Sequence, residues 1–482
     1  MTRIAPPRYR EPMSHTAVIL AAGQGTRMRS RQPKVLHRLA GRSMLRHLIG
    51  AAEPMFDRIA VVVGPGMDAV AREAEPHPSV VQSERRGTAH AALQAEALFG
   101  DGDVAVLYGD NPLISGATLR RLLSRRREPG VALALLAMRP ADPGRYGRVV
   151  EAGGPGGLGS SVERIVEWAD ASEDERAIGL CNAGVLCAAS ADMARWLHAV
   201  RPDNAKGEFY LTDVVALAAA EGAGVVAVEA PEAELRGVNT RAELAAAEAV
   251  VQAALRLRAM EGGATLTAPE TVFLCADTVL APDVVVGPHV VFGPGVRVGE
   301  GAEIRAFSHL EGCVVGERAV VGPYARLRPG TVLGESSHVG NFVELKATTL
   351  GAGAKANHLA YLGDASIGAR TNVGAGAITC NYDGHAKHRT TIGEGAFIGS
   401  DAVLVAPLRI GDGALIAAGS VIVADVAADA LAFGRARQSS LPGGAAAFRA
   451  RRTAAAPAVP APDAGPHGPA GPVMPASPEG AP

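Results

Sequence analysis

A six-residue repeat is the feature that most limits how this 482-residue chain can fold. Aliphatic side chains, many of them followed by Gly, recur at every sixth residue between 286 and 422, in long groups with one interruption. Val286, Phe292, Val298 and Ile304 show the step. Such a repeat is typical of a parallel β-helix, in which the aliphatic side chain points into the coil and Gly permits the corner. Three sides make a coil of 18 residues, so this stretch predicts roughly seven coils.

The repeat is interrupted between Gly374 and Thr391, in AGAITCNYDGHAKHRT. A loop that leaves a regular scaffold is a common place for binding groups, so we expect functional residues there. After Arg452 the chain is rich in Pro and has no periodic apolar pattern, which predicts a disordered tail over 453–482. Residues 1–12 are expected to be a disordered extension, with Met13 as the true start.

The N-terminal half has a different pattern. Short apolar runs, among them 59–63, 104–108 and 131–137, alternate with helix-like segments from Thr16 to about Asn239. This alternation predicts an α/β domain with a mostly parallel, Rossmann-like sheet covered on both faces. Residues 240–261 contain no Pro or Gly and predict one long connecting helix. The expected domains are therefore 13–241, a linker helix at 242–262, and a hexapeptide-repeat domain at 263–452.

Charge and cysteine content narrow the classes of partner. The 47 basic and 49 acidic side chains nearly cancel, which argues against nucleic acid or a membrane surface as a partner and favours small molecules. No apolar stretch is long enough to cross a bilayer. The five cysteines lack the paired spacing of zinc or redox motifs, so we expect a reduced, cytoplasmic setting.

The segment LAAGQGTRM, residues 20–28, directly follows the first expected strand. Gly23 and Gly25 allow backbone N–H groups to approach phosphate oxygens, while Arg27 and Lys34 supply positive charge. Taken alone, the same segment also fits a simple strand-to-helix turn with surface cations.

The whole run L-x-A-G-x-G-T-R-M followed by P-K resembles the sugar-phosphate nucleotidyltransferases. Further matching pieces are QSERRGTAHA (82–91), YGD (108–110), YGR (146–148), IVE (165–167), CNAG (181–184), GEFYLTD (207–213) and GVNT (237–240). Together with the repeat, the chain resembles the bacterial bifunctional N-acetylglucosamine-1-phosphate uridyltransferases and glucosamine-1-phosphate acetyltransferases, over residues 16 to about 440. In that family the β-helix is left-handed.

Asp110 follows the expected strand VAVLY, where a carboxylate would face the ligand crevice of a parallel sheet, although an Asp there could also cap a helix. The resemblance implies that Asp110 and Asn239 hold Mg²⁺ and that Arg27 and Lys34 are catalytic. It also implies that Leu20 to Gly23, Gln82, Gly87 and Thr88 contact the uridine nucleotide. The full set implied for UDP-sugar binding is Leu20, Ala21, Ala22, Gly23, Lys34, Gln82, Gly87, Thr88, Tyr108, Gly109, Asp110, Gly147, Glu167, Asn182 and Asn239.

The chain departs from the family pattern at four positions. Trp168 and Ala169 follow Glu167 where relatives usually have a polar residue and Lys, and Ala183 replaces a Thr. Ala360 replaces a Thr often found in the second domain. The first three departures put the affinity for the sugar in doubt, and Ala360 is expected to remove one hydrogen bond.

The repeat region carries PYARLRPG, HVGNFVELK, NHLAYLGD, NVGAG and CNYDG, whose polar residues an inert scaffold would not need. His358 is the general base implied by the resemblance, and the ordinary pKa of an imidazole, near 6.5, suits removal of a proton from an amine. The residues implied for the sugar phosphate are Arg328, Lys346, Tyr361 and Asn372. Those implied for acetyl-CoA are Ala375, Asn381, Tyr382, Ser400, Ala418 and Arg435.

The resemblance thus implies a bifunctional enzyme that acetylates glucosamine 1-phosphate with acetyl-CoA and then transfers uridylyl from UTP to the product. The product, UDP-N-acetylglucosamine, supplies cell-wall and outer-envelope synthesis. A homotrimer is implied by resemblance alone. Two alternatives stay open from the residues: a single-activity sugar-phosphate nucleotidyltransferase whose β-helix serves assembly or regulation, and a non-catalytic scaffold whose sites have decayed.

Overall fold

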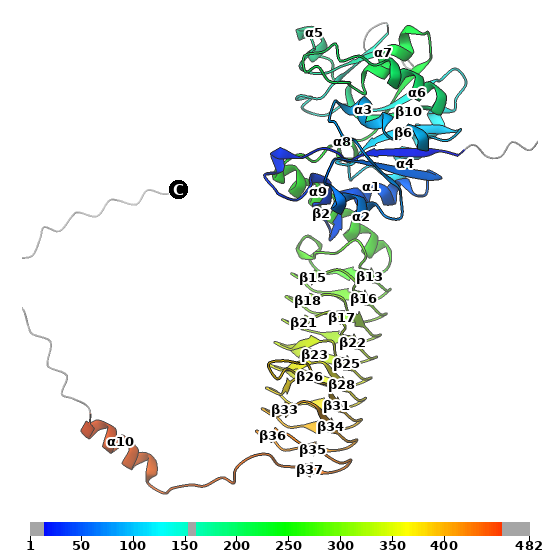
Figure 1. Cartoon of the computed structure of the whole chain (residues 1–482). Coiled ribbons are helices and arrows are strands. Elements are labelled where there is room, and N and C mark those ends of the chain that lie inside the picture. Colours follow the sequence, from blue (N-terminus) through cyan, green and yellow to red (C-terminus); the bar gives the residue numbers. More distant parts are fainter. Residues whose placement is uncertain (1–13, 153–160, 456–482) are drawn as a thin grey trace, which may run out of the picture. The chain divides into compact units, whose positions relative to one another are not determined.

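The computed structural model describes residues 14–152 and 161–455 (Figure 1). The expectations for residues 1–12 and for the tail beyond residue 455 therefore lie outside the described residues. The chain divides into one compact unit that extends to Gly434 and a second that begins at Arg435. In the second unit, α10 (Gly444–Ala455) includes residues 453–455, so the boundary expected at Arg452 lies inside this helix.

The N-terminal half contains the expected α/β sheet. Its strands follow the order β11-β7-β10-β6-β1-β4-β5, with β8 and β9 paired beside β10. The apolar runs of the predicted sheet form β1 (Thr16–Leu20), β4 (Arg58–Val63), β6 (Asp103–Tyr108), β7 (Leu133–Met138) and β11 (Val225–Glu229), and β5 (Ser79–Val81) forms one edge. β1 pairs in parallel with both β4 and β6, so their carboxyl ends meet at one edge of the sheet.

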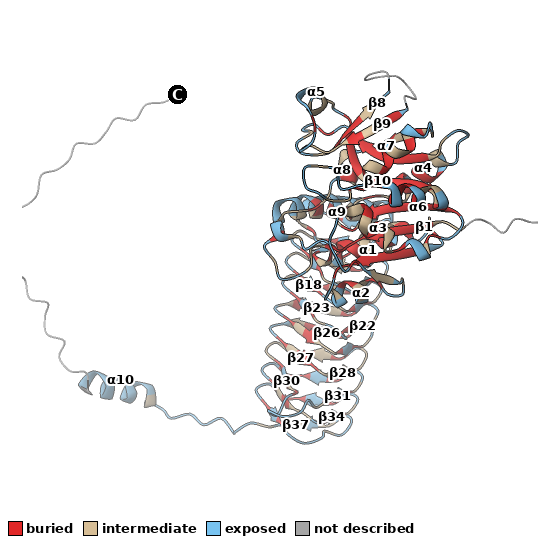
Figure 2. Ribbon diagram, turned by 45° about the horizontal axis from the view of Figure 1, so that its top comes forward, coloured by how far each residue is buried: buried red, intermediate tan, exposed pale blue. Residues whose placement is uncertain are grey.

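Helices cover both faces of this sheet, as expected. One apolar core lies between the sheet and α1 (Met44–Ala52), α2 (Asp68–Ala74) and α4 (Gly116–Arg126). A second core lies under α3 (Thr88–Leu93), α6 (Ser190–Ala199) and α7 (Asp213–Ala220). Figure 2 shows the buried strands between their partly exposed helices. The alternating pattern of apolar runs and helices thus predicts the layers correctly.

Along the main strand order, one strand runs against the others. β10 (Cys181–Ala189) lies between β6 and β7 and pairs antiparallel with both. It brings in the hairpin of β8 (Arg148–Glu151) and β9 (Val162–Val166) at its start. The sheet is therefore mixed, and the hairpin places residues 147 and 167 close together at the edge where the sugar is expected.

A long helix connects the two halves. α9 (Arg241–Glu261) begins at a capping box, in which Thr240 and Glu243 each bond the other's backbone N–H, and ends at Gly262. Two short strands, β2 (Arg38–Leu39) and β3 (Arg42–Ser43), form a hairpin whose Ala40 carbonyl accepts the Ala276 N–H at 2.8 Å. The remaining short elements are η1 (Thr26–Met28), η2 (Lys34–Leu36), η3 (Glu96–Leu98), α5 (Glu173–Arg176), α8 (Glu232–Leu235) and η4 (Pro269–Thr271).

The second half is a parallel β-helix with three faces, stacked coil upon coil (Figure 1). Face 1 contains β12 (Thr265–Leu266), β14 (Val285–Val286), β17 (Glu303–Ile304), β20 (Val320–Val321), β23 (His338–Asn341), β26 (Lys355–His358), β29 (Asn372–Val373), β32 (Phe397–Ile398), β35 (Leu415–Ile416) and β37 (Leu431–Ala432). Face 2 contains β15 (Val291–Phe292), β18 (His309–Leu310), β21 (Arg326–Leu327), β24 (Glu344–Lys346), β27 (Tyr361–Gly363), β30 (Ile378–Cys380), β33 (Val403–Val405) and β36 (Val421–Ile422). Face 3 contains β13 (Val279–Leu280), β16 (Arg297–Val298), β19 (Val314–Val315), β22 (Val332–Leu333), β25 (Thr349–Leu350), β28 (Ala365–Ile367), β31 (Thr390–Ile392) and β34 (Leu408–Ile410).

The repeat produces this structure because one residue of each strand points inward. The aliphatic positions of the repeat, such as Ile304, Val321 and Val339, are fully buried and form one continuous core. Each strand bonds the strand one coil away in parallel register, for example Ile304 with Val321. The β-helix begins at Thr265, one coil earlier than the repeat suggested. The interruption is also shorter than expected, because β30 still pairs with β27 and β33. Within residues 375–391, only the loop 381–389 leaves the coil.

A buried amide joins the connecting helix to the first coil. The Gln252 side chain, 3% exposed, donates to the Leu274 carbonyl at 2.7 Å and accepts the Leu274 N–H at 2.9 Å. We expect Gln252→Ala to lower the free energy of unfolding by about 2 kcal/mol, because both Leu274 groups would be left unpaired. Thermal and urea unfolding measure this, with Leu257→Ala, on the exposed face of α9, as the control. Equal stability of the two variants would contradict the role of Gln252.

Candidate functional site

A cavity of about 280 Å³ opens at the carboxyl ends of β1 and β6. All residues expected at the uridine nucleotide line it: Leu20, Ala21, Ala22, Gly23, Gln82, Gly87 and Thr88. Gly23 faces open space, so its backbone is accessible to a phosphate. Gly87 has a φ of +122°, and a Cβ there would lie 2.4 Å from the Phe209 carbonyl oxygen, so a glycine is required at this turn. Arg85 and Glu208, which sequence reasoning missed, also line the cavity.

Two cations and two side chains with oxygen acceptors meet where Lys34 and Asp110 line this cavity. The Lys34 ammonium donates to the Asp110 carboxylate and, at 3.0 Å, to the Asn239 amide oxygen. The Arg27 guanidinium donates to the same amide oxygen at 2.9 Å. Gly25, with a φ of +63°, lies directly against Lys34 and leaves no room for a side chain. The structure therefore brings together the four residues that were expected at the phosphates and the metal. They come from segments that lie up to more than 200 residues apart in the sequence.

The oxygen atoms of Asp110 and Asn239 suit a magnesium ion. Mg²⁺ prefers oxygen ligands and usually keeps several waters beside one or two protein groups and the substrate phosphates. Both side chains bind the same ammonium, which shows that their oxygens converge on one point. Among the described residues no group of three or more His, Cys, Asp or Glu side chains could hold a metal ion. A site with few protein ligands, completed by water and phosphate, is what this arrangement can provide.

The residues expected at the sugar lie together beyond Tyr108. The Gly147 carbonyl accepts the Asn182 N–H at 2.9 Å, and a Cβ on Gly147 would lie 3.5 Å from the Glu167 carboxylate. The Asn182 amide oxygen accepts the Gly184 N–H, and among the described residues no hydrogen bond is made by its NH₂ group. Burial raises the pKa of Glu167, while the Thr212 hydroxyl, 3.3 Å away, donates to the carboxylate. This end of the site thus offers a carboxylate and an amide to hydroxyl and amide groups of a sugar.

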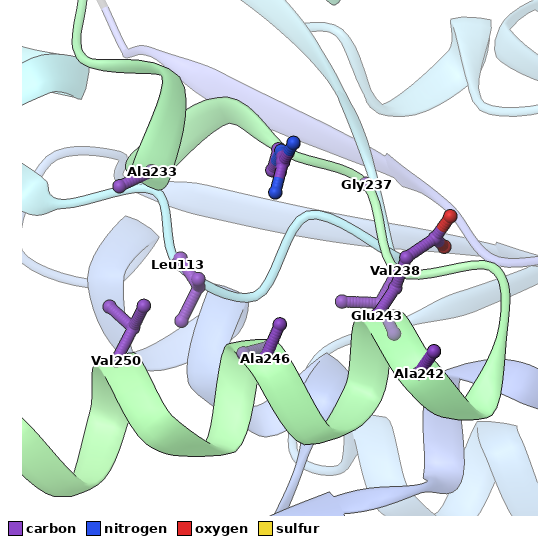
Figure 3. A pocket seen from close by; sticks show the side chains of 10 residues that line it. Leu113, Ala233, Gly237, Val238, Ala242, Glu243, Ala246 and Val250 are labelled. Atoms are coloured by element: carbon purple, nitrogen blue, oxygen red, sulfur yellow. The ribbon is translucent and has the colours of Figure 1, made fainter. Parts of the chain in front are cut away.

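An apolar pocket of about 330 Å³ lies behind the segment that carries Asn239 (Figure 3). Leu113, together with Ala246 and Val250 of α9, faces it. Its two charged lining residues are Arg236 and Glu243, and the Glu243 carboxylate accepts the Asn239 N–H at 2.5 Å. The pocket offers few polar groups to a phosphorylated substrate, but its wall fixes the backbone of a proposed metal ligand.

Several residues expected at the second site lie in one column along the β-helix. His358 ends β26, and the parallel register places Asn341 beside it on one coil and Ala375, Ser400 and Ala418 on the coils that follow. The His358 imidazole Nδ1 lies 2.7 Å from the Asn341 amide oxygen. That contact favours the tautomer with a proton on Nδ1, which leaves the lone pair of Nε2 free to accept a proton.

Cations gather on face 2 beside this column. Lys346 lies 3.5 Å from the Asp364 carboxylate, and Arg328 donates to Glu344 at 2.9 Å. The loop 381–389 adds Lys387, and a hydrogen bond with the Lys346 ammonium lowers the pKa of Lys387. Three cations on one surface suit a phosphate group. Sequence reasoning missed Lys387, although it lies inside the interruption that was expected to bring functional residues.

The remaining residues of the second site fall into two places. Tyr361 and Asn381 meet over Gly363, where a Cβ would lie 2.6 Å from the Tyr361 hydroxyl and 2.9 Å from the Asn381 amide nitrogen. The Asn381 amide also donates to Asp364, so Asn381 lies with the sugar-phosphate residues. Asn372 pairs with Lys355 on face 1, and Tyr382 is exposed at the tip of the loop. Arg435 is the first residue of the second compact unit.

The comparisons with known proteins cover both halves. Residues 17–268 match the family model of the MobA-like NTP transferase domain, and residues 389–424 match that of the bacterial transferase hexapeptide with six repeats. The chain is 68% identical to the bifunctional protein GlmU of Gluconacetobacter diazotrophicus, over 90% of this chain and 94% of that protein. It is 67% identical to that of Granulibacter bethesdensis, over 92% and 98%, and 64% identical to that of Acidiphilium cryptum, over 91% and 99%.

The first residue of α7 provides a pH-dependent test of the sugar end. Burial, followed by repulsion from Glu167 and Asp170, raises the pKa of Asp213 from 3.8 to about 6. A carboxyl group with a raised pKa stabilises the fold below pH about 4, where it is protonated in both states, and this stabilisation is lost as the pH rises through 6. We expect Asp213→Asn, which stays neutral, to raise the melting temperature at pH 7 more than at pH 4. The control is Asp68→Asn, an exposed first-turn carboxylate of α2, and the same pH dependence in both variants would contradict this assignment.

Proposed function

The chain belongs to the family of bifunctional GlmU proteins, and from this premise we propose which of its residues carry out each reaction. The enzyme is a uridyltransferase and an acetyltransferase: it acetylates glucosamine 1-phosphate with acetyl-CoA and couples N-acetylglucosamine 1-phosphate with UTP to form UDP-N-acetylglucosamine and pyrophosphate. This function replaces the two alternatives, the single-activity nucleotidyltransferase and the decayed scaffold. The domains would be those expected from the sequence, with the uridyltransferase in 13–241 and the acetyltransferase in 263–452.

The uridyltransferase proposal is supported above all by the convergence of Lys34, Arg27, Asp110 and Asn239 at the mouth of the nucleotide cavity. The sugar-phosphate oxygen is already ionised at neutral pH, so no strong base is needed. It attacks the α-phosphorus of UTP, a new P–O bond forms, and the bond to the departing pyrophosphate breaks. Arg27 and Lys34 stabilise the negative charge that develops on the phosphates. Gly147, Glu167 and Asn182 hold the sugar, with Tyr108 and Gly109 completing the wall beside them.

We propose that Mg²⁺ is the cofactor of this half and that Asp110 and Asn239 hold it. When bound, the ion would neutralise phosphate charge and orient the reacting groups. The protein supplies two convergent oxygen atoms there and two cations beside them, so substrate phosphates and water would complete the ligand set.

In the acetyltransferase, His358 acts as the general base. The amine of glucosamine 1-phosphate attacks the thioester carbonyl of acetyl-CoA, the C–N bond forms, and the C–S bond breaks with release of CoA. Nε2 of His358 accepts the proton from the amine, while Asn341 holds Nδ1. Arg328, Lys346 and Lys387 bind the phosphate, with Tyr361 beside them. Asn372, on face 1, is proposed as a further contact of the sugar phosphate. The small residues Ala375 and Ala418, with Ser400 between them, leave room for the coenzyme along the column, and Tyr382 of the loop would contact it. Asn381, which donates to Asp364, lies instead with the residues proposed for the sugar phosphate.

We further propose a homotrimer. At the corner between faces 1 and 2, the rings of His289, Phe307, Tyr324 and Phe342 stack on successive coils, with centroids 4.8 to 5.3 Å apart. Phe342 is 56% exposed, and Leu359, one coil further along, is 62% exposed. A row of exposed apolar side chains of this length suits contact with further copies of the chain. The column that holds His358 runs beside this row, so the acetyl sites would lie near the contacts between copies.

The enzyme is proposed to be cytoplasmic. Its five cysteines are free thiols, as a reducing compartment would keep them. In the part of the chain that the structure describes, no helix is long and apolar enough to span a membrane.

Asp110→Asn tests the uridyltransferase site. The change keeps the side-chain size but removes the charge proposed to hold the metal, so we expect uridylyl transfer at ordinary Mg²⁺ to fall about a hundredfold or more. Acetyl transfer by the same protein serves as the internal control, since Asp110 lies in the other half. Formation of UDP-N-acetylglucosamine at a near-normal rate would overturn the assignment of Asp110.

His358→Ala tests the acetyltransferase site. We expect acetyl transfer, followed as release of CoA, to fall about a hundredfold or more, the usual contribution of a positioned base. The unmutated enzyme should lose acetyl transfer as the pH falls, because a protonated imidazole cannot accept the proton of the amine. His309→Ala, an exposed histidine on face 2, is the matched control. An unchanged rate and pH profile in His358→Ala would show that another group is the base.

Phe342→Glu tests the assembly. A charge in the middle of the apolar row should weaken the contacts between copies, because those contacts would have to bury it. The apparent mass in sedimentation should then fall. Acetyl transfer should fall as well, because the acetyl sites are proposed to lie near these contacts. Val314→Glu places the same charge at an exposed position on face 3, the side opposite the row, and should leave the mass unchanged. Equal masses for the two variants would contradict an interface at this corner.

A further inference from the structure

Trp168, one of the departures from the family pattern, lies against two arginines at the sugar end of the uridyltransferase site. The guanidinium carbons of Arg145 and Arg176 lie over its ring, 4.9 and 4.5 Å from the centroid. The Arg176 Nε also donates to the Trp168 carbonyl at 3.3 Å. Three segments meet in this contact: the loop before β8, the residues after β9, and the end of α5. Trp is the best aromatic partner for a cation, and arginine is the more frequent cation in such pairs.

The buried Arg148 side chain joins two of the same segments, the loop before β8 and the end of α5. Its side chain is 2% exposed, an unusual position for an arginine. The guanidinium donates to the carbonyls of Pro143, Gly144 and Tyr146 in the loop before β8, and to the carbonyl of Arg176 at the end of α5. All the acceptors of these hydrogen bonds are backbone carbonyls, and in the described residues no carboxylate forms an ion pair with Arg148. A planar group with five donors at fixed angles holds such a loop in one conformation.

The segments that these contacts hold together carry two of the residues proposed to bind the sugar, Gly147 and Glu167. Gly147 lies between Tyr146, whose carbonyl Arg148 binds, and Arg148 itself. Glu167 directly precedes Trp168 in the sequence. A Cβ on Gly147 would lie 3.5 Å from the Glu167 carboxylate, and the Gly147 carbonyl accepts the Asn182 N–H. A shift of either segment would therefore separate groups that must reach the same sugar ring.

We propose that Arg145, Arg148, Trp168 and Arg176 form a clamp that positions Gly147 and Glu167 for N-acetylglucosamine 1-phosphate. This inference rests on the proposed function, in which those two residues contact the sugar. The four residues of the clamp are positioning residues, because they act on the binding groups rather than on the substrate. A site held in its binding geometry before the ligand arrives loses less freedom on binding, so the clamp acts on the affinity for the sugar.

Trp168→Leu and Trp168→Phe test the aromatic part of the clamp. Loss of the aromatic face in Trp168→Leu should raise the KM for N-acetylglucosamine 1-phosphate about fivefold and change the KM for UTP less than about twofold. Trp168→Phe keeps an aromatic face and should recover most of the difference. Arg195→Ala removes a guanidinium from Trp196, the other tryptophan of the chain, and is the matched control with no expected change in KM. Acetyl transfer should be unchanged in all three variants.

Arg148→Lys tests the buried part, since it keeps the charge but loses the fork of donors. In a Trp196→Phe background Trp168 is the only tryptophan, and its fluorescence reports on the clamp. We expect Arg148→Lys to increase quenching of Trp168 by acrylamide and to raise the KM for the sugar phosphate together. Increased quenching with an unchanged KM would overturn the positioning role, as would an equal rise in the KM values for UTP and the sugar phosphate.

Glu167→Gln separates the failure of this inference from failure of the proposed function. If Glu167→Gln raises the KM for the sugar phosphate and the clamp variants do not, the sugar site is correct and the clamp is wrong. If neither Glu167→Gln nor the clamp variants change this KM, the proposed sugar site itself is wrong. A rise in both supports the clamp.

Discussion

Parallel hydrogen bonding between successive coils is the constraint on which the second half of the molecule depends. Each short strand pairs with a strand 17 or 18 residues away in most coils, and one inward side chain per strand keeps the register. The register alone brings Asn341, His358 and Ala375 into one column. A slip by a single residue would turn the inward side chains out and move His358 out of line with Asn341. The chemistry of this half is thus fixed by the same interactions that stabilise its fold.

The sequence predicts the β-helix well because aliphatic side chains report directly on which residues point inward. The prediction was wrong where the inward residue is polar. Thr379 is buried in the coil and its hydroxyl accepts the Gly363 N–H at 2.7 Å, so a count of aliphatic residues does not find β30. The antiparallel direction of β10 was missed for a related reason. A buried strand is apolar in either direction, and its pairing depends on connections that the apolar pattern does not contain.

The residues of the candidate sites also divide into those that the sequence predicts and those that it does not. Residues that belong to a contiguous motif, such as Gly23 and Thr88, could be placed from the sequence, and the structure gathers them around one cavity. Asn341 and Lys387 could not be placed from the sequence, because the residues that they contact lie on another coil or across a loop. An arginine is rarely buried without a carboxylate partner, so the sequence alone would predict that Arg148 lies at the surface. Four carbonyls at suitable angles make its burial possible, and no local sequence pattern indicates them.

Among the residues that the structure describes, the apolar cores of the two halves share none. Heat or denaturant can therefore disrupt one core while the other persists, and the two activities need not disappear together. A partly denatured sample that retained its β-helix would still consume acetyl-CoA but would leave N-acetylglucosamine 1-phosphate unconverted. Under stress, such a protein would release a sugar phosphate that the intact enzyme passes on as a nucleotide sugar, so an intermediate rather than the end product would accumulate.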